Sequence, residues 1–190
     1  VVSVADSPLD LFLPKAGWVE QSPESWWIAT CKAVSSAISK LDDFIIHGIG
    51  LSGQMQSLVA MDRFGEVIRP SILWNDVRTT EQCDLIRSKI GNERLRELTG
   101  NPALEGFTAT KILWLRDNEP ENYERITKIL LPKDYVRYRM TGNLATEPSD
   151  AAATLLFDIK TSDWSVDMVQ HLDLDESILP PIIPSCGIGG

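Results

Sequence analysis

The chain has 190 residues, of which 43% are hydrophobic and 24% charged, a composition typical of a globular domain with its own core and unlike that of a disordered segment. Its 18 basic and 27 acidic residues leave a formal charge of -9 with no basic stripe, so we expect no nucleic-acid partner and no anionic membrane surface. The apolar runs fall short of the ~18 to 20 residues that span a bilayer, and no cationic leader opens the chain, which favours a cytoplasmic protein.

The sequence pattern of the first part of the chain predicts a strand, then a helix, then a second strand. Residues 1–4 form a β-branched run, and Ser22, Pro23 and Glu24 mark the start of a helix that we expect to continue to about Leu41. Residues 44–49 are apolar on both alternating faces, which is typical of a strand buried on both sides of a sheet. The order predicts an α/β fold.

Two short apolar runs then flank a turn. Residues 57–61 and 71–74 are separated by an Asp-Arg-Phe-Gly sequence, which predicts a hairpin with polar and aromatic groups at the strand ends. Periodicity and capping signals further predict helices at residues 76–90, 92–98, 108–118 and 164–172 and a strand at 128–131.

Familiar catalytic and metal-binding motifs are missing. The sequence contains no P-loop, no HExxH and no Gly-x-Ser-x-Gly elbow. Three cysteines lie far apart outside any CxxC pattern, and two histidines have no ligand at metal-binding spacing, so we expect reduced thiols and no metal site.

Aromatic and polar side chains recur together at the ends of the predicted elements. They are Met55, Gln56, Trp74, Asn75, Asp76, Phe107 and Asp150. An aromatic plane covers the C–H face of a polyol, while amides and carboxylates replace the water bound to its hydroxyls. The pattern indicates a sugar site.

Several separated motifs resemble the FGGY carbohydrate kinases, and in particular their xylulokinase branch. The matching runs are GWVEQSPESWW (17–27), GQMQ (53–56), RPSILWNDVR (69–78), GFTATKILWLRDN (106–118), LPKDY (131–135) and SDAAAT (149–154). They follow the order of the family and cover essentially the whole chain.

The resemblance implies a ribonuclease-H-like, actin-type ATPase fold of which residues 1–190 are one incomplete N-terminal, sugar-binding lobe. It implies transfer of the γ-phosphoryl of ATP, with Mg²⁺, to a ketopentose, D-xylulose above all, and the possibility of a homodimer. The family's first β-hairpin, which meets phosphate and Mg²⁺, and its ATP lobe have no counterpart in this chain. The general-base Asp is expected beyond Gly190, so we expect no catalytic residue, no metal site and no kinase activity in this polypeptide alone.

The resemblance also carries over individual substrate-binding residues. Met55 and Gln56 fall where the family contacts the ketose, while Trp74 and Phe107 fall where related kinases place aromatic rings. Asp150 is a further candidate, for which capping of a helix is an equal alternative. Gln56 departs from the pattern, because xylulokinases usually have His there, and Gln keeps a donor and an acceptor but does not become cationic.

Two hypotheses from other functional classes remain as alternatives to a sugar kinase. A non-catalytic sugar-binding or regulatory module of the same fold would bind a pentulose without an ATP lobe. A purely structural actin-like fragment would bind no sugar at all. For Lys111 and Trp114, which lie in the signature run, packing is the more ordinary role.

Overall fold

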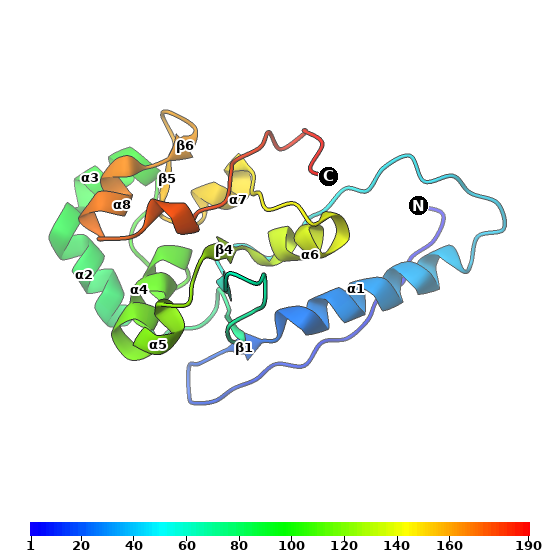
Figure 1. Cartoon of the computed structure of the whole chain (residues 1–190), viewed down its shortest axis with the longest axis horizontal. Coiled ribbons are helices and arrows are strands. Elements are labelled where there is room, and N and C mark those ends of the chain that lie inside the picture. Colours follow the sequence, from blue (N-terminus) through cyan, green and yellow to red (C-terminus); the bar gives the residue numbers. More distant parts are fainter.

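The computed structural model describes residues 1–190, and it shows a helical body from which one long helix and two loops extend (Figure 1). In chain order the elements are β1 (Glu20–Gln21), α1 (Pro23–Ile38), β2 (Val59–Met61), β3 (Ser71–Ile72), α2 (Thr80–Ile90), α3 (Asn92–Thr99), α4 (Thr108–Asn118), α5 (Pro120–Tyr123), β4 (Lys128–Leu130), α6 (Pro132–Thr141), α7 (Pro148–Ala152), β5 (Phe157–Asp158), β6 (Asp163–Trp164), α8 (Val166–His171) and the 3₁₀ turn η1 (Glu176–Ile178). Helices α2, α3, α4, α5 and α8 gather at one end, and α1 lies at the other (Figure 1).

Four short antiparallel strands run through the middle of the molecule. β1 pairs with β3, β2 pairs with β4, and a single bridge between Leu58 and Ile72 joins the two pairs in the order β1-β3-β2-β4. Along the β2 segment Leu58 and Ala60 belong to the larger hydrophobic core, whereas Val59 and Met61 belong to the smaller one. Successive side chains of a strand point to opposite faces, so β2 divides the two cores.

Helix α4 is the centre of the larger core. Eight of its residues, from Thr108 to Leu115, are buried, and Ile112 and Leu113 have no exposed surface. Helices α2 and α5 pack against α4, and α3 packs against α2. A helix enclosed on all sides holds the residues at its N-terminus firmly in place, and those residues adjoin the predicted sugar site.

The hairpin prediction is confirmed. Gly65 has a φ of 78°, the Asp62 carboxylate accepts hydrogen bonds from the backbone amides of Phe64 and Glu66, and the amide of Ile68 donates to the carbonyl of Ala60. The turn chemistry of this segment is local, which explains why the sequence pattern was sufficient.

Most predicted helices form, with shifts at their ends. Helix α1 starts at Pro23 as expected but ends at Ile38 rather than Leu41. Helix α2 begins at Thr80, not at Asp76, because the Asp76 carboxylate accepts hydrogen bonds from Val19 and Arg78 in the preceding turn. Helix α8 starts late because Asp163–Trp164 pairs with Phe157–Asp158 as a strand.

Two predicted strands are wrong. Residues 1–4 and 44–49 have no strand structure, and Ile45 and Ile49 are 80% and 69% exposed. The apolar stripe of α1 is also largely uncovered, since only Pro23 and Trp26 of this helix are buried. A strand needs a partner for its backbone groups, and an apolar pattern does not supply that partner.

Candidate functional site

Gln56 and Trp74 meet beside Gly106. A Cβ atom at position 106 would lie 2.8 Å from Oε1 of Gln56 and 2.9 Å from the backbone oxygen of Trp74. Trp74 is 53% exposed, although the residues before it in β3 are fully enclosed. The backbone of Trp74 therefore lies close to the Gln56 amide, and an exposed indole and an amide on neighbouring segments can cover the C–H face of a small polyol and hydrogen-bond to its hydroxyls.

Ser57 ties the two segments of this surface together. Its side chain is buried, its hydroxyl accepts a hydrogen bond from the backbone amide of Trp74 at 3.1 Å, and it lies 3.2 Å from Oε1 of Gln54. The loop that carries Met55 and Gln56 is therefore held against the end of β3.

Met55 and Asp150 line a cavity with a volume of about 860 Å³. Its walls come from the loop at residues 46–53, from α6, from the start of α7 and from residues 183–190. Met55 is 42% exposed, whereas Asp150 is almost completely enclosed. Met55 belongs to the same loop as Gln56, so the cavity and the Gln56–Trp74 surface adjoin.

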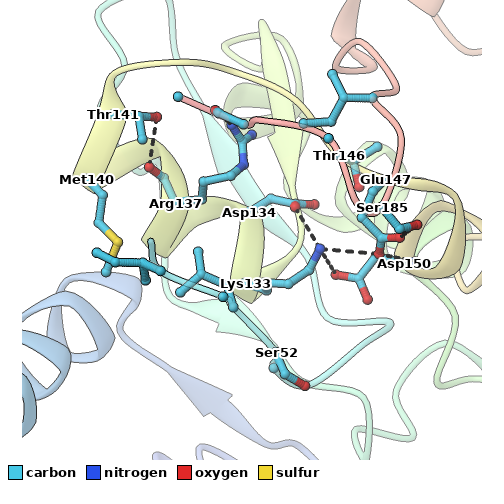
Figure 2. A pocket seen from close by; sticks show the side chains of 18 of the residues that line it. Ser52, Lys133, Asp134, Arg137, Met140, Thr141, Thr146, Glu147, Asp150 and Ser185 are labelled. Carbon is cyan, nitrogen blue, oxygen red and sulfur yellow. Dashed lines mark hydrogen bonds and ion pairs between the residues drawn. The ribbon is translucent and has the colours of Figure 1, made fainter. Parts of the chain in front are cut away.

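The polar floor of the cavity is built around Lys133 of α6 (Figure 2). Its Nζ lies 3.3 Å from Oδ1 of Asp134, 3.3 Å from Oε1 of Glu147 and 3.1 Å from Oδ2 of Asp150. Burial lowers the pKa of Lys133, but the three carboxylates together raise it above its ordinary value. The ammonium therefore stays charged and neutralises part of this acidic cluster.

Burial raises the pKa of Asp150 to about 6, against the opposing effect of Lys133. Asp150 does not cap a helix with its own side chain. It stands in the first turn of α7, and Glu147 is the N-cap residue, accepting from the backbone amides of Ser149 and Asp150 at 3.0 and 2.9 Å. The capping alternative therefore applies to Glu147, and the Asp150 carboxylate lies in the cavity wall beside Lys133.

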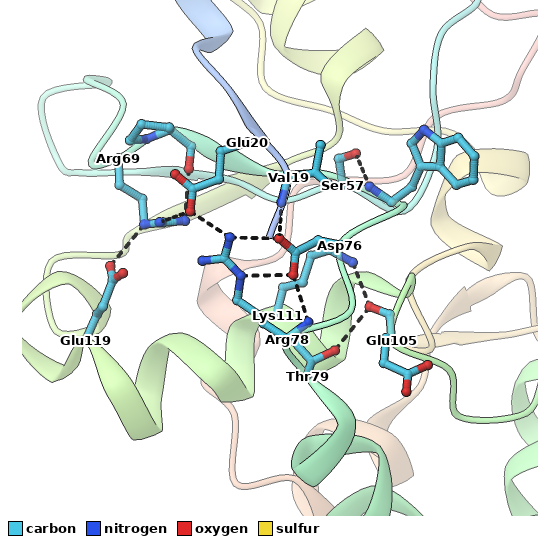
Figure 3. A network of polar contacts seen from close by, with 12 residues as sticks. Val19, Glu20, Ser57, Arg69, Asp76, Arg78, Thr79, Glu105, Lys111 and Glu119 are labelled. Carbon is cyan, nitrogen blue, oxygen red and sulfur yellow. Dashed lines mark hydrogen bonds and ion pairs between the residues drawn. The ribbon is translucent and has the colours of Figure 1, made fainter. Parts of the chain in front are cut away.

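A buried ion network holds the segment around Asp76 and Arg78, which follows Trp74 in the chain (Figure 3). The Asp76 carboxylate accepts from the amide of Val19 at 2.6 Å and from Nε and Nη2 of Arg78 at 2.9 and 2.7 Å. Arg78 also lies 2.8 Å from Glu20 and stacks 3.8 Å from the ring centre of Trp18. The network joins β1 to the segment between β3 and α2.

Lys111 anchors the loop that precedes α4. Its side chain is fully buried, and its Nζ donates to the backbone carbonyls of Glu105 at 3.0 Å, of Phe107 at 3.4 Å and of Gly106 (Figure 3). Burial lowers the pKa of Lys111 to about 7. Phe107 is only 5% exposed and packs in the larger core, as does Trp114, so the aromatic ring at 107 faces protein on most of its surface.

The structure adds residues that the sequence reasoning did not single out. Lys133 and Glu147 belong to the cavity, and Gly106 and Thr108 contact Gln56. The sequence EPSD at 147–150, an acceptor followed by Pro and a short helix, is the one signal that could have identified Glu147 as a cap. The other contacts join segments far apart in the chain.

Metal ligands do not cluster in this chain. No group of three or more His, Cys, Asp or Glu side chains is placed to hold a metal ion. The acidic residues of the cavity instead surround Lys133, which occupies the position that a cation would need. In addition, no helix combines the length and apolar character needed to cross a membrane.

Comparison with known proteins identifies close relatives. The family model described as the FGGY family of carbohydrate kinases, N-terminal domain, matches residues 1–190. The chain is 45% identical over 172 residues, 90% of its length, to a xylulose kinase of Staphylococcus xylosus, and 45% identical over 187 residues, 97% of its length, to one of Lactococcus lactis. It spans 36% and 37% of those two proteins.

A solved structure has the same fold. A xyloylose kinase from Brucella ovis superposes with a TM-score of 0.88 at 36% sequence identity, over 94% of this chain and 37% of that protein.

Proposed function

Because the chain belongs to the FGGY family of carbohydrate kinases, with the N-terminal domain of that family matching all of residues 1–190, we propose that it is the single sugar-binding domain of an ATP-dependent sugar kinase. The reaction is transfer of the γ-phosphoryl of ATP to a ketopentose, with D-xylulose converted to D-xylulose 5-phosphate. The observation that carries this proposal is the identity of 45% to two proteins named xylulose kinase over at least 90% of the chain. The non-catalytic module is less favoured, because these relatives are named as kinases.

The sugar binds across the Gln56–Trp74 surface and the rim of the adjoining cavity. Trp74 covers the apolar face of the ketose, while the amide of Gln56 donates to one hydroxyl and accepts from another. Met55 and Asp150 bound the sugar on the cavity side, where both residues line the wall. Phe107, being almost fully buried, serves as a fixed wall beneath the sugar rather than as a stacking surface.

ATP and Mg²⁺ belong to the rest of the complete enzyme. The carboxylates of this chain do not fit a magnesium site, since they surround Lys133 and form no cluster of three free ligands. The general-base carboxylate, the phosphate-binding hairpin and the nucleotide lobe are likewise assigned to segments outside residues 1–190. The contribution of this chain is to bind and orient the sugar, which raises the rate by fixing the attacking hydroxyl relative to the phosphate.

The test is an ADP-release assay with the complete protein on D-xylulose, D-ribulose, L-ribulose and xylitol. We expect sugar-dependent turnover with D-xylulose preferred, and no turnover with the 190-residue chain alone. Absence of sugar-dependent ATP turnover in the complete protein would refute the proposal. The family resemblance further leads us to propose a cytoplasmic homodimer, which sedimentation of the complete protein would test.

Gln56 is the residue at which sugar preference should respond. Gln and His have comparable reach, but only His gains a positive charge near neutral pH. We expect the Gln56→His variant of the complete enzyme to change the order of kcat/KM values among the four sugars. An unchanged order would show that position 56 does not determine preference.

A further inference from the structure

The backbone of Gln56 has an unusual conformation. Its φ is 66°, in the left-handed region that residues with a Cβ atom avoid. Such a conformation persists only where the surroundings hold it, and it occurs preferentially at functional sites. Its chain neighbours close a tight turn around it, since the backbone amide of Ser57 donates to the carbonyl of Met55 at 2.8 Å. The question is which residues outside this turn hold Gln56 in it.

Thr108 supplies one contact. It is the first residue of α4, it is fully buried, and its hydroxyl donates to the backbone oxygen of Gln56 at 3.1 Å. Thr108 therefore binds the peptide group next to the strained torsion. Because α4 is enclosed by the larger core, the donor is fixed relative to the sheet.

Gly106 supplies the space. The side-chain oxygen of Gln56 lies so close to Gly106 that a Cβ atom there would come within 2.8 Å of it and within 2.9 Å of the Trp74 carbonyl. Gly106 does not itself have a positive φ, so its backbone would accept another residue. Glycine is required here for the close approach of the Gln56 amide and not for its own conformation.

The loop that contains Gly106 is held from the other side by Lys111. The ammonium group donates to three successive carbonyls, those of Glu105, Gly106 and Phe107. With its carbonyls turned toward Lys111, this loop presents the Cα of Gly106 to Gln56. The position of the Gln56 amide is thus determined by the N-terminus of α4 and the loop before it.

We propose that Thr108 and Gly106 are positioning residues that hold Gln56 in its left-handed conformation, so that its amide is oriented toward the sugar and sets the sugar preference. This inference rests on the proposed kinase function. Neither residue contacts the sugar itself. Thr108 acts through the main chain of Gln56, and Gly106 acts through the space left for its side chain.

The experiment compares Thr108→Val, which keeps shape but removes the donor, with Thr108→Ser, which keeps the donor, in the complete protein. Thr99→Val is the matched control, because Thr99 is equally buried and its hydroxyl bonds only within the end of α3 and the following turn. We expect Thr108→Val to raise the KM for D-xylulose about tenfold, the value of one hydrogen bond, with the KM for ATP unchanged. Thr108→Ser and Thr99→Val should keep the wild-type sugar KM.

A crystal structure of the Thr108→Val variant gives a readout that does not depend on activity. A negative φ at Gln56 together with the selective rise in sugar KM would support the inference, and a φ that stays positive would overturn it. A changed φ with an unchanged sugar KM and unchanged sugar order would also overturn it. If the wild-type protein phosphorylates no sugar, the proposed function fails separately, and the φ of the variant still decides whether Thr108 holds Gln56.

Gly106→Ala is a second, independent variant, useful if Thr108→Val does not fold. The added methyl group must displace the Gln56 amide, so the sugar KM should rise and the order of sugars should change, while the KM for ATP stays constant. Equal effects on the sugar and ATP KM values would indicate general damage and would contradict the inference.

Discussion

Replacing Asp76 by Asn should destabilise the chain strongly, because the Asp76 carboxylate is buried and fully used. It is 1% exposed and accepts four hydrogen bonds, from the amides of Val19 and Arg78 and from two nitrogens of the Arg78 guanidinium. Asparagine has nearly the same shape, but its NH₂ group would replace one acceptor by a donor facing other donors. The ion pair is lost at the same time.

The expected loss of unfolding free energy depends on the ion pair that Arg78 retains in the variant. Breaking a buried ion pair by removing one partner costs ~3 to 5 kcal/mol. Arg78 retains Glu20 at 2.8 Å, so it is not left without a counter-charge, and we expect a loss of ~3 kcal/mol, the lower end of that range. A loss of this size is a large fraction of the total stability of a domain.

Urea denaturation of the 190-residue chain, followed by circular dichroism, measures the change in the free energy of unfolding. Asp84→Asn is the matched control, since Asp84 pairs with Arg87 at 2.6 Å on the surface with its side chain 71% exposed. An exposed pair of this kind contributes ~0 to 1 kcal/mol. If the two variants lose the same free energy, the buried network does not have the role described.

Three further predictions concern other parts of the chain. Burial raises the pKa of Glu147, but hydrogen bonds from Ser149, Ser185 and two backbone amides lower it from 4.5 to about 2. The ionised carboxylate therefore stabilises the fold above pH 4.5, and this stabilisation is lost as the pH falls toward 2. Denaturation at several pH values should show the stability gap between wild type and Glu147→Gln closing over that window, whereas a constant gap would contradict it. Burial raises the pKa of the Cys83 thiol to about 11, whereas Cys31 and Cys186 are exposed. A thiol reagent should therefore label Cys31 and Cys186 in the native chain and Cys83 only after unfolding. Labelling of Cys83 in the native chain would be inconsistent with its burial. At Gln56, Gly should be more stable than Ala by ~1 kcal/mol because glycine adopts a positive φ without strain, and an equal or lower stability of the Gly variant would argue against strain at this residue.

Local structure could be predicted from the sequence wherever the residues that determine it are close in the chain. The hairpin around Asp62 and Gly65 and the start of α1 at Pro23 depend on turn and capping residues within a few positions. The candidate residues Gln56 and Trp74 were also identified from their types and their places at strand ends, and the structure brings them together beside Gly106. Their role in sugar binding stays a prediction.

The strands predicted at residues 1–4 and 44–49 failed for the opposite reason. Their apolar pattern expresses a preference for burial, but burial and hydrogen bonding of a strand need a partner segment that the pattern does not specify. The side chains of Ile45 and Ile49 are exposed, which shows that no partner segment buries this apolar stretch.

By itself, the sequence determined most of the helices and turns and the motifs through which the chain resembles a sugar kinase. Only the tertiary structure decided that Lys133 joins Asp134, Glu147 and Asp150 under the cavity, and that the Thr108 hydroxyl donates to the backbone oxygen of Gln56, whose φ is positive. The physical reason is distance along the chain. Periodicity and capping act over a few residues, whereas the contact from Thr108 to Gln56 closes a separation of 52 residues and exists only after the core around α4 has packed.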